Sequence, residues 1–108
     1  LDYRLKQLGI DPSDVNGYEN EEFTHMSVAV TVQSGAVDAA LGIYAAAKAL
    51  NLDFIPVVTE QYDLVIPEIY FESENIQILL ETIDSSEFKN KVEALGGYST
   101  ERTGQIIV

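Results

Sequence analysis

The sequence has no cysteine, no tryptophan and a single histidine among its 108 residues. Without cysteine there are no disulfides, thiolate nucleophiles or thiolate metal ligands. His25 has no second imidazole beside it, so we expect no metal site. No apolar run approaches the roughly 20 residues that a membrane-spanning helix needs, and the first residues do not form a signal peptide. We therefore expect a cytoplasmic protein. Leu1 in place of Met favours a chain that begins inside a larger reading frame, with N-terminal processing as the alternative explanation.

Positive charge is also scarce. Six Lys and Arg residues face 18 Asp and Glu residues, which gives a net charge of −12. Nucleic-acid binding needs clustered basic side chains, and acidic membranes repel an acidic surface, so neither partner is expected. The acid excess is typical of a soluble domain. A hydrophobic content of 46% is enough for one small core.

Helix-forming patterns recur along the chain. Thr24 is placed to cap a helix that Ser34-Gly35 would end, and Asp84-Ser85-Ser86 separates two amphipathic segments. Gly9 and Gly96-Gly97 are further stop signals. Helices are predicted over residues 2–8, 24–32, 44–50, 75–83 and 87–95.

Short apolar runs lie between these helices and are typical of strands buried on both faces. They cover residues 37–43, 54–59 and 62–66, with Pro67 as a stop. Weaker strand signals lie at 15–18 and at the end of the tail. This order of helices and strands predicts an α/β fold with a mainly parallel sheet.

Several segments together resemble one known family, the type 2 periplasmic-binding-protein-like domain found C-terminally in MoeA-type molybdopterin-biosynthesis proteins and in some helix-turn-helix regulators. The segments are Glu21-Glu22-Phe23-Thr24-His25, residues 32–43 (VQSGAVDAALGI), residues 52–56 (LDFIP) and residues 62–67 (YDLVIP). The resemblance implies a three-layer lobe and identifies residues 1–108 as the C-terminal part of such a domain. It also implies partners: the missing N-terminal lobe and an attached enzyme or DNA-binding domain.

The resemblance further implies a small anion, such as molybdate or tungstate, as ligand, and no cofactor. The segments that would face it are two helix starts, one at Thr24, His25 and Ser27 and the other at Ile43 and Tyr44. Helix N-termini suit anions because their N–H groups and the macrodipole point outward. Other interpretations stay open: Thr24 and Ser27 as helix caps alone, His25 as a surface residue, and Tyr44 as a packing residue.

Nothing in the sequence indicates catalysis. Ser27, His25 and Asp38 contain the residue types of a catalytic triad, but no nucleophile elbow surrounds them. Glu19, Glu21 and Glu22 lack the spacing of a calcium loop. We therefore expect this chain to have no catalytic activity. The resemblance still implies that the longer parent protein is a molybdopterin-biosynthesis enzyme or a related regulator.

Two functions remain for the chain. The first is a non-catalytic oxyanion-binding module, and the alternative is a ligand-free interaction or dimerisation domain. The apolar faces of residues 54–66 and 76–83 have no predicted cover within the chain. Because large exposed apolar patches tend to find a partner, we expect a homodimer.

Overall fold

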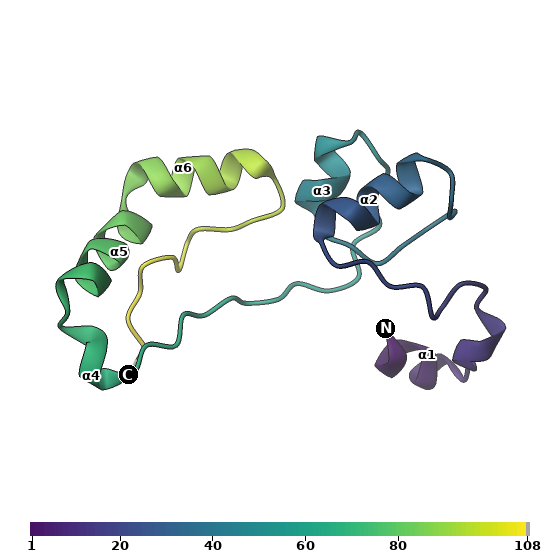
Figure 1. The fold of residues 1–108 in the computed structure, drawn as a ribbon, viewed down its shortest axis with the longest axis horizontal. Helices are drawn as coiled ribbons and strands as arrows, with labels where there is room; N and C mark the ends of the chain where they lie inside the picture. The colour runs from purple at the N-terminus through teal and green to yellow at the C-terminus, as the bar shows by residue number, and fades with distance from the viewer. Residues whose placement is uncertain (108) are drawn as a thin grey trace. The chain divides into compact units, whose positions relative to one another are not determined.

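The computed structural model describes residues 1–107 and contains helices joined by long irregular segments (Figure 1). The helices are α1 (Asp2–Leu8), the 3-10 helix η1 (Pro12–Asp14), α2 (His25–Gln33), α3 (Tyr44–Ala49), α4 (Glu68–Phe71), α5 (Glu74–Asp84) and α6 (Ser86–Leu95). The chain divides into two compact units, Leu1–Leu52 and Asp53–Val108. Each unit is described by itself.

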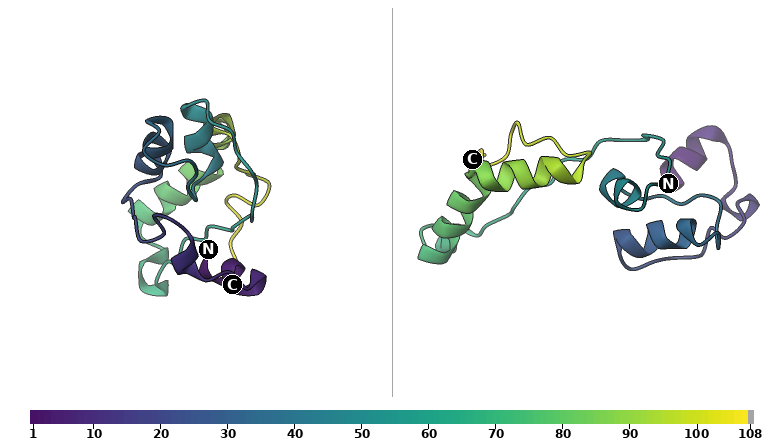
Figure 2. Two further views of the ribbon diagram at one scale, coloured as in Figure 1. Left: turned by 90° about the vertical axis from the view of Figure 1, so that its right-hand side faces the viewer. Right: turned by 90° about the horizontal axis from the view of Figure 1, so that it is seen from above.

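The first unit is held together by α2 and α3, which pack side by side (Figures 1 and 2). Ala29 of α2 and Ala46 and Ala47 of α3 are buried. Alanine brings two helix backbones close together but buries little apolar area per residue. Leu5 of α1 is the remaining buried hydrophobic residue of this unit. The core of the first unit is therefore small.

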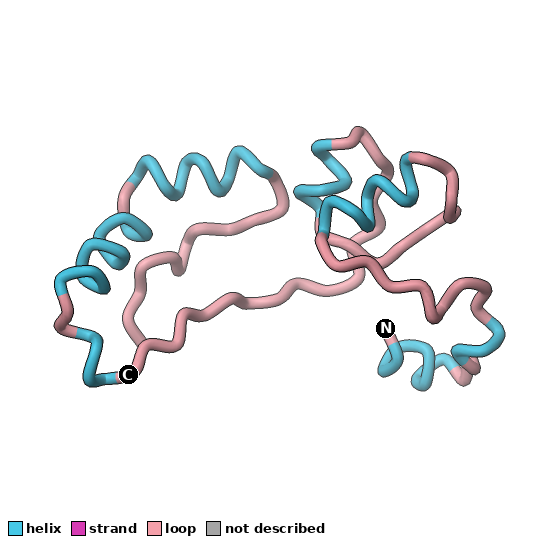
Figure 3. Tube along the Cα trace, in the orientation of Figure 1, coloured by secondary structure: helices cyan, strands magenta, loops and turns pink. Residues whose placement is uncertain are grey.

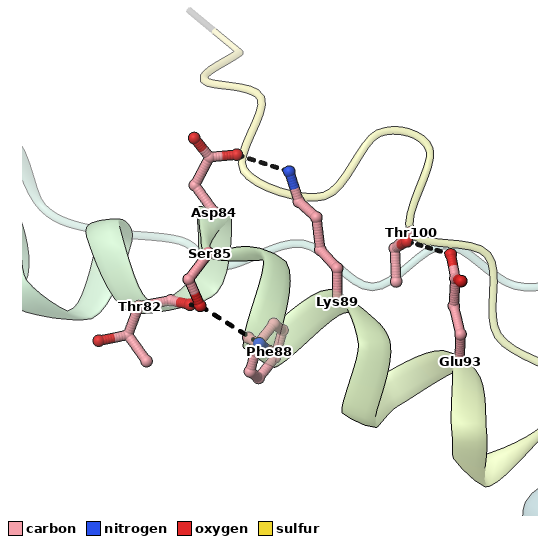
Figure 4. Close-up of polar contacts among 7 residues, drawn as sticks. All are labelled: Thr82, Asp84, Ser85, Phe88, Lys89, Glu93 and Thr100. Atoms are coloured by element: carbon pink, nitrogen blue, oxygen red, sulfur yellow. Dashed lines mark hydrogen bonds and ion pairs between the residues drawn. The ribbon is translucent and has the colours of Figure 1, made fainter.

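The second unit is built around a bend between α5 and α6. Ser85 ends α5 and caps α6: its Oγ accepts from the Phe88 N–H at 3.2 Å and donates to the Thr82 carbonyl at 2.6 Å (Figure 4). The tail after α6 returns along this helix, where the buried Thr100 donates a hydrogen bond to Glu93. Within residues 53–107 no hydrophobic side chain is fully buried. Caps and polar contacts thus define this unit more than a core does.

The predicted fold class is wrong. No residue from 1 to 107 is in a β-strand, so there is neither a parallel sheet nor a three-layer α/β lobe (Figure 3). Residues 37–43, 54–59 and 62–66 form irregular or extended chain, and residues 15–18 form a turn closed by the Tyr18 N–H on the Val15 carbonyl. A strand exists only when a second segment lies within hydrogen-bonding distance. These apolar runs have no such neighbour among the described residues.

The predicted helices are confirmed to within a few residues, because their end signals are local. Thr24 caps α2, and Gly9 (φ 67°) closes α1 with its N–H on the Leu5 and Lys6 carbonyls. The short α4 was not predicted, because four residues after Pro67 carry too little periodicity. The strand predicted at the end of the tail is absent through residue 107, and Val108 lies outside the described residues.

Candidate functional site

The start of α2 is fixed by a reciprocal cap. Thr24 has extended backbone angles (φ −134°, ψ 153°), and its Oγ1 accepts from the Ser27 N–H at 3.0 Å. The Ser27 Oγ in turn accepts from the Thr24 N–H at 3.2 Å. This is the capping-box arrangement with serine in place of the usual Glu or Gln. The polar side chains at this helix start are therefore held in one geometry.

The cap uses both hydroxyl hydrogens. The Ser27 hydroxyl donates to the Thr24 carbonyl at 2.9 Å, and the Thr24 hydroxyl donates to Ser27 Oγ at 3.0 Å. Helix geometry leaves the first N–H groups without a partner in the helix itself. Among residues 1–107, the N–H groups of His25 and Met26 have no acceptor. The donors without a partner at this helix start are therefore the two backbone N–H groups and not the two hydroxyls.

The second predicted helix start lies against the first. A Cβ built on Gly42 would be 3.4 Å from Cγ1 of Val28, which directly follows the first turn of α2. Ile43 then begins α3 with extended angles (φ −100°, ψ 149°) and offers no side-chain cap. Ile43 is half-buried and Tyr44 is exposed. The structure therefore brings both predicted segments into one region of the first unit.

Charge is unevenly distributed between the units. Residues 1–52 contain three Lys and Arg against seven Asp and Glu, a net of −4, whereas residues 53–108 contain three against eleven, a net of −8. The single hydrogen of the Thr31 hydroxyl is shared between the Ser27 carbonyl at 2.8 Å and the Glu22 carboxylate at 3.1 Å. Thr31 lies in the second half of α2. The helix start thus belongs to the less acidic unit, although Glu21 and Glu22 lie just before the Thr24 cap.

The other candidate residues lie apart from this region. Asp38 is exposed in the loop after α2, and the Ser27 hydroxyl is engaged with Thr24, so Ser27, His25 and Asp38 do not form a triad among the described residues. Arg102 lies in the second unit and donates to Gln61 Oε1 at 2.9 Å. No cluster of three or more His, Asp or Glu side chains within residues 1–107 is placed to hold a metal ion. No helix in this range has the length and apolar composition needed to cross a membrane.

Two open hollows were not predicted. One, of about 320 Å³, lies in the second unit and is mainly apolar, and the other, of about 350 Å³, lies beside α1. The first is lined by Val65, Ile66, Pro67, Tyr70, Ser73, Asn75 and Ile76, and the second by Asp2, Lys6, Ile10, Asp11 and Pro12. Each hollow lies at a place where the chain changes direction, near Pro67 in the first case and near Pro12 in the second. For the first, Pro67 was the available signal, but it was interpreted only as the end of a strand.

Comparison with known proteins identifies the family. The family model described as the PBP superfamily domain matches residues 1–84, which is most of the chain. The chain therefore belongs to the PBP superfamily, as the resemblance to periplasmic-binding-protein-like domains implied. No solved structure matches the chain.

Two relatives match the chain from end to end. An uncharacterized protein in the 5′ region of a ferredoxin 2Fe-2S gene of Clostridium pasteurianum is 40% identical over 108 residues, which cover 99% of this chain and 96% of that relative. The uncharacterized protein YvgK of Bacillus subtilis is 36% identical over 108 residues, which cover all of this chain but 34% of YvgK. The same sequence pattern thus makes up nearly all of one relative and about a third of another.

Proposed function

We propose that this chain is a non-catalytic binding module whose ligand is a small oxyanion of the molybdate or tungstate type. The binding region is the start of α2 together with the adjoining start of α3. The observation that carries the proposal is the pair of unpartnered N–H groups of His25 and Met26 in a first turn held by the Thr24–Ser27 cap. Membership of the PBP superfamily supports a role in binding, and we place the parent protein in molybdenum-cofactor biosynthesis or its regulation.

Neutral donors suit such a ligand. Backbone N–H groups and the helix dipole stabilise an anion without a cationic side chain. The net charge of −12 opposes the anion, but charges more than about 8–10 Å away are screened by salt. Distant acids therefore slow association more than they weaken the complex. Because His25 and its neighbours are exposed, we expect weak binding, in the millimolar range or about 4 kcal/mol.

The test is a titration of the ¹⁵N-labelled protein with molybdate, tungstate, sulfate and phosphate, followed by amide NMR. We expect the His25 and Met26 amide signals to move furthest. His25→Ala removes the imidazole, whereas His25→Pro also removes one backbone donor at the first helical position, where proline is tolerated. Binding should weaken a little in the first variant and by roughly tenfold in the second, which corresponds to the loss of one good hydrogen bond to a charged group.

The matched control is Glu74→Pro, which makes the same backbone change at the first residue of α5. This variant should bind the anions as the unmodified protein does. If none of the four anions moves the His25 and Met26 signals, the oxyanion proposal is wrong. Equal weakening by Glu74→Pro would contradict the assignment to α2.

A second candidate function is that of an interaction domain without a ligand. It is favoured by the apolar side chains that the second unit exposes. Val65 is 92% exposed, Ile55 84% and Ile69 82%. Apolar surface of this extent marks association sites in soluble proteins. Two measurements separate the two candidate functions: anion binding is read from the amide signals of His25 and Met26, whereas association is read from the molar mass without any anion.

A further inference from the structure

Asn16 and Gly17 occupy the middle of an exposed turn between η1 and α2. The Tyr18 N–H bonds to the Val15 carbonyl at 3.2 Å and closes the turn around them. Gly17 has φ +76°, in the left-handed region that glycine adopts without a steric penalty. Both residues are exposed, and Figure 3 shows the chain between η1 and α2 as loop. The pair is therefore open to solvent on a segment that no helix restrains.

The Gly17 N–H has no partner in this turn. The bond that closes a four-residue turn uses the N–H of the last residue and not that of the third. The next bond along the chain joins the Asn20 N–H to the Gly17 carbonyl at 3.0 Å. Neither the Gly17 N–H nor the Asn16 side-chain amide has a hydrogen-bond partner among residues 1–107. No hydrogen bond of the described residues has to break before these two groups meet.

The two groups are the reactants of an intramolecular acyl transfer. The Gly17 nitrogen, on losing its proton, attacks Cγ of Asn16 and closes a five-membered imide ring. The bond from Cγ to Nδ2 breaks, and ammonia leaves with the proton that the nitrogen gave up. Because both groups belong to one short stretch of chain, the step is effectively unimolecular. Glycine favours it further, since it has no Cβ to crowd the nitrogen in the ring.

Water completes the change by opening the imide. Addition of water at the side-chain carbonyl gives an aspartate at position 16, and addition at the backbone carbonyl gives an isoaspartate, whose main chain runs through the former side chain. Water is the single co-reactant in this sequence of steps. We propose that Asn16 is a site of spontaneous deamidation, so that the protein accumulates aspartyl and isoaspartyl forms of this turn. The proposal is independent of both candidate functions.

Other asparagines lack one of the two conditions. Asn20 is exposed in the same loop, but Glu21 follows it, and the Glu21 side chain crowds the nitrogen that would attack. Asn51 is also exposed, but the Leu52 N–H that follows it donates to the Ala47 carbonyl at 2.9 Å. The remaining asparagines lie within α5 and α6: Asn75 and Asn90.

The modification alters both the charge and the backbone of the turn. Either product adds a carboxylate to a chain whose net charge is already −12. The isoaspartyl form also inserts a methylene into the main chain between the Val15 carbonyl and the Tyr18 N–H, which now bond at 3.2 Å. The change is confined to the loop between η1 and α2, so we expect the helices to be retained.

The test is incubation of the 108-residue protein at neutral pH, followed by ion-exchange chromatography and mass spectrometry of a digest. We expect a more acidic species in which the Asn16 peptide has exchanged NH for O, with isoaspartate detected by enzymatic methylation of its carboxylate. Asn16 should react roughly tenfold or more faster than Asn20, which corresponds to a barrier lower by about 1.4 kcal/mol. An Asn16 rate no higher than that of Asn20 overturns the inference.

Asn16→Gln is the matched variant. It keeps an amide side chain and leaves Gly17 in place, but its ring would have six members and closes more slowly, so the acidic species should be lost. Gly17→Ala is less suitable, because its Cβ would lie 3.1 Å from Nδ2 of Asn20 in a backbone conformation that alanine strains. Persistence of the acidic species in Asn16→Gln would place the reaction at another residue and overturn the inference.

Unfolding in urea tests the free N–H. Because the Gly17 N–H is unbonded in the folded turn, urea should change the Asn16 rate by no more than about threefold, a barrier difference below about 1 kcal/mol. Leu52→Gly creates a second Asn-Gly pair at Asn51, whose following N–H is bonded at 2.9 Å. This pair should react roughly tenfold or more faster in urea than in the folded protein.

The measurements on Asn16 use the unmodified chain, so they decide the inference whether or not Leu52→Gly folds. Helical circular dichroism shows whether that variant keeps its helices. A large acceleration of Asn16 in urea would mean that the fold engages the Gly17 N–H, and it would overturn the inference. None of these outcomes bears on anion binding or on association.

Discussion

Asp11 is a residue whose pKa is shifted by hydrogen bonds from one neighbour, Ser13. Its Oδ1 accepts from both the hydroxyl and the N–H of Ser13, at 2.7 and 2.9 Å. The hydroxyl bond is the larger cause and the backbone bond the second, and together they hold the pKa of Asp11 below its ordinary value of 3.8. Hydrogen bonds to a carboxylate favour its charged form.

The expected outcome is an NMR titration midpoint for Asp11 below 3.8 that returns most of the way in Ser13→Ala. A folded-state pKa below the unfolded one stabilises the fold at pH values above the unfolded pKa, and this contribution is lost as pH falls through the folded pKa. Ser73→Ala removes a hydroxyl that bonds the Tyr70 carbonyl instead and should leave Asp11 unchanged. An Asp11 midpoint that is the same in Ser13→Ala as in the unmodified protein would contradict this account.

Gly104 combines two constraints at one residue. Its φ is +87°, and a Cβ there would lie 2.5 Å from the Asp84 carboxylate oxygen that pairs with Lys89 at 2.7 Å (Figure 4 shows the Asp84–Lys89 pair). Gly104→Ala should lower the free energy of unfolding by about 1–3 kcal/mol, from backbone strain and from the contact with Asp84. Urea denaturation measures this change.

Gly35→Ala separates the two causes. Gly35 has φ +76°, but nothing lies within 4 Å of its Cβ position, so this variant should cost only about 1 kcal/mol, for the backbone alone. Removing the carboxylate in Asp84→Ala should lower the cost of Gly104→Ala but leave it above that of Gly35→Ala, because the Asp84 Cβ, which alanine keeps, would still lie 3.0 Å from the added Cβ. Equal costs for the two glycines with Asp84 in place would show that the tail does not approach Asp84 as described.

At the scale of elements, helices were predictable because their signals are local. Thr24, Ser85 and Gly9 each mark a helix end through a bond to a residue within a few positions. The strands were not predictable for the opposite reason. The runs at 37–43 and 54–66 have the composition of buried strands, but composition cannot supply the neighbour that a strand needs. The prediction of strands buried on both faces was thus wrong in pairing and in burial, since Ile55, Val58 and Val65 are 84%, 72% and 92% exposed.

The candidate site shows the same division. Thr24 and Ser27 could be identified from the sequence, since the capping pattern lies within four residues. The interpretation of Thr24 and Ser27 as helix caps, left open by the sequence, is the one that the structure shows, and it leaves the backbone N–H groups of His25 and Met26 as the donors without a partner. The sequence also gave no sign that Gly42 would approach Val28, because that contact joins the loop before α3 to a residue of α2 far away in the sequence.

At the scale of the whole molecule, charge opposes the association that apolar surface favours. Each chain carries −12, so a dimer brings two strongly acidic bodies together. The apolar contact itself is insensitive to moderate salt, whereas repulsion between the surrounding exposed acids is screened over a Debye length of about 30 Å at 0.01 M and about 8 Å at 0.15 M.

The dimer dissociation constant should therefore fall by several-fold as sodium chloride rises from about 0.01 to 0.15 M, and it should then level off. Sedimentation at a series of salt concentrations measures this dependence. Glu60→Gln and Asp63→Asn each remove one charge near the exposed apolar side chains of Tyr62 and Leu64 and should reduce the salt dependence without weakening the dimer. The opposite trend, in which salt dissociates the dimer, would mean that ion pairs between the copies hold it together. That result would contradict association through the exposed apolar side chains of the second unit.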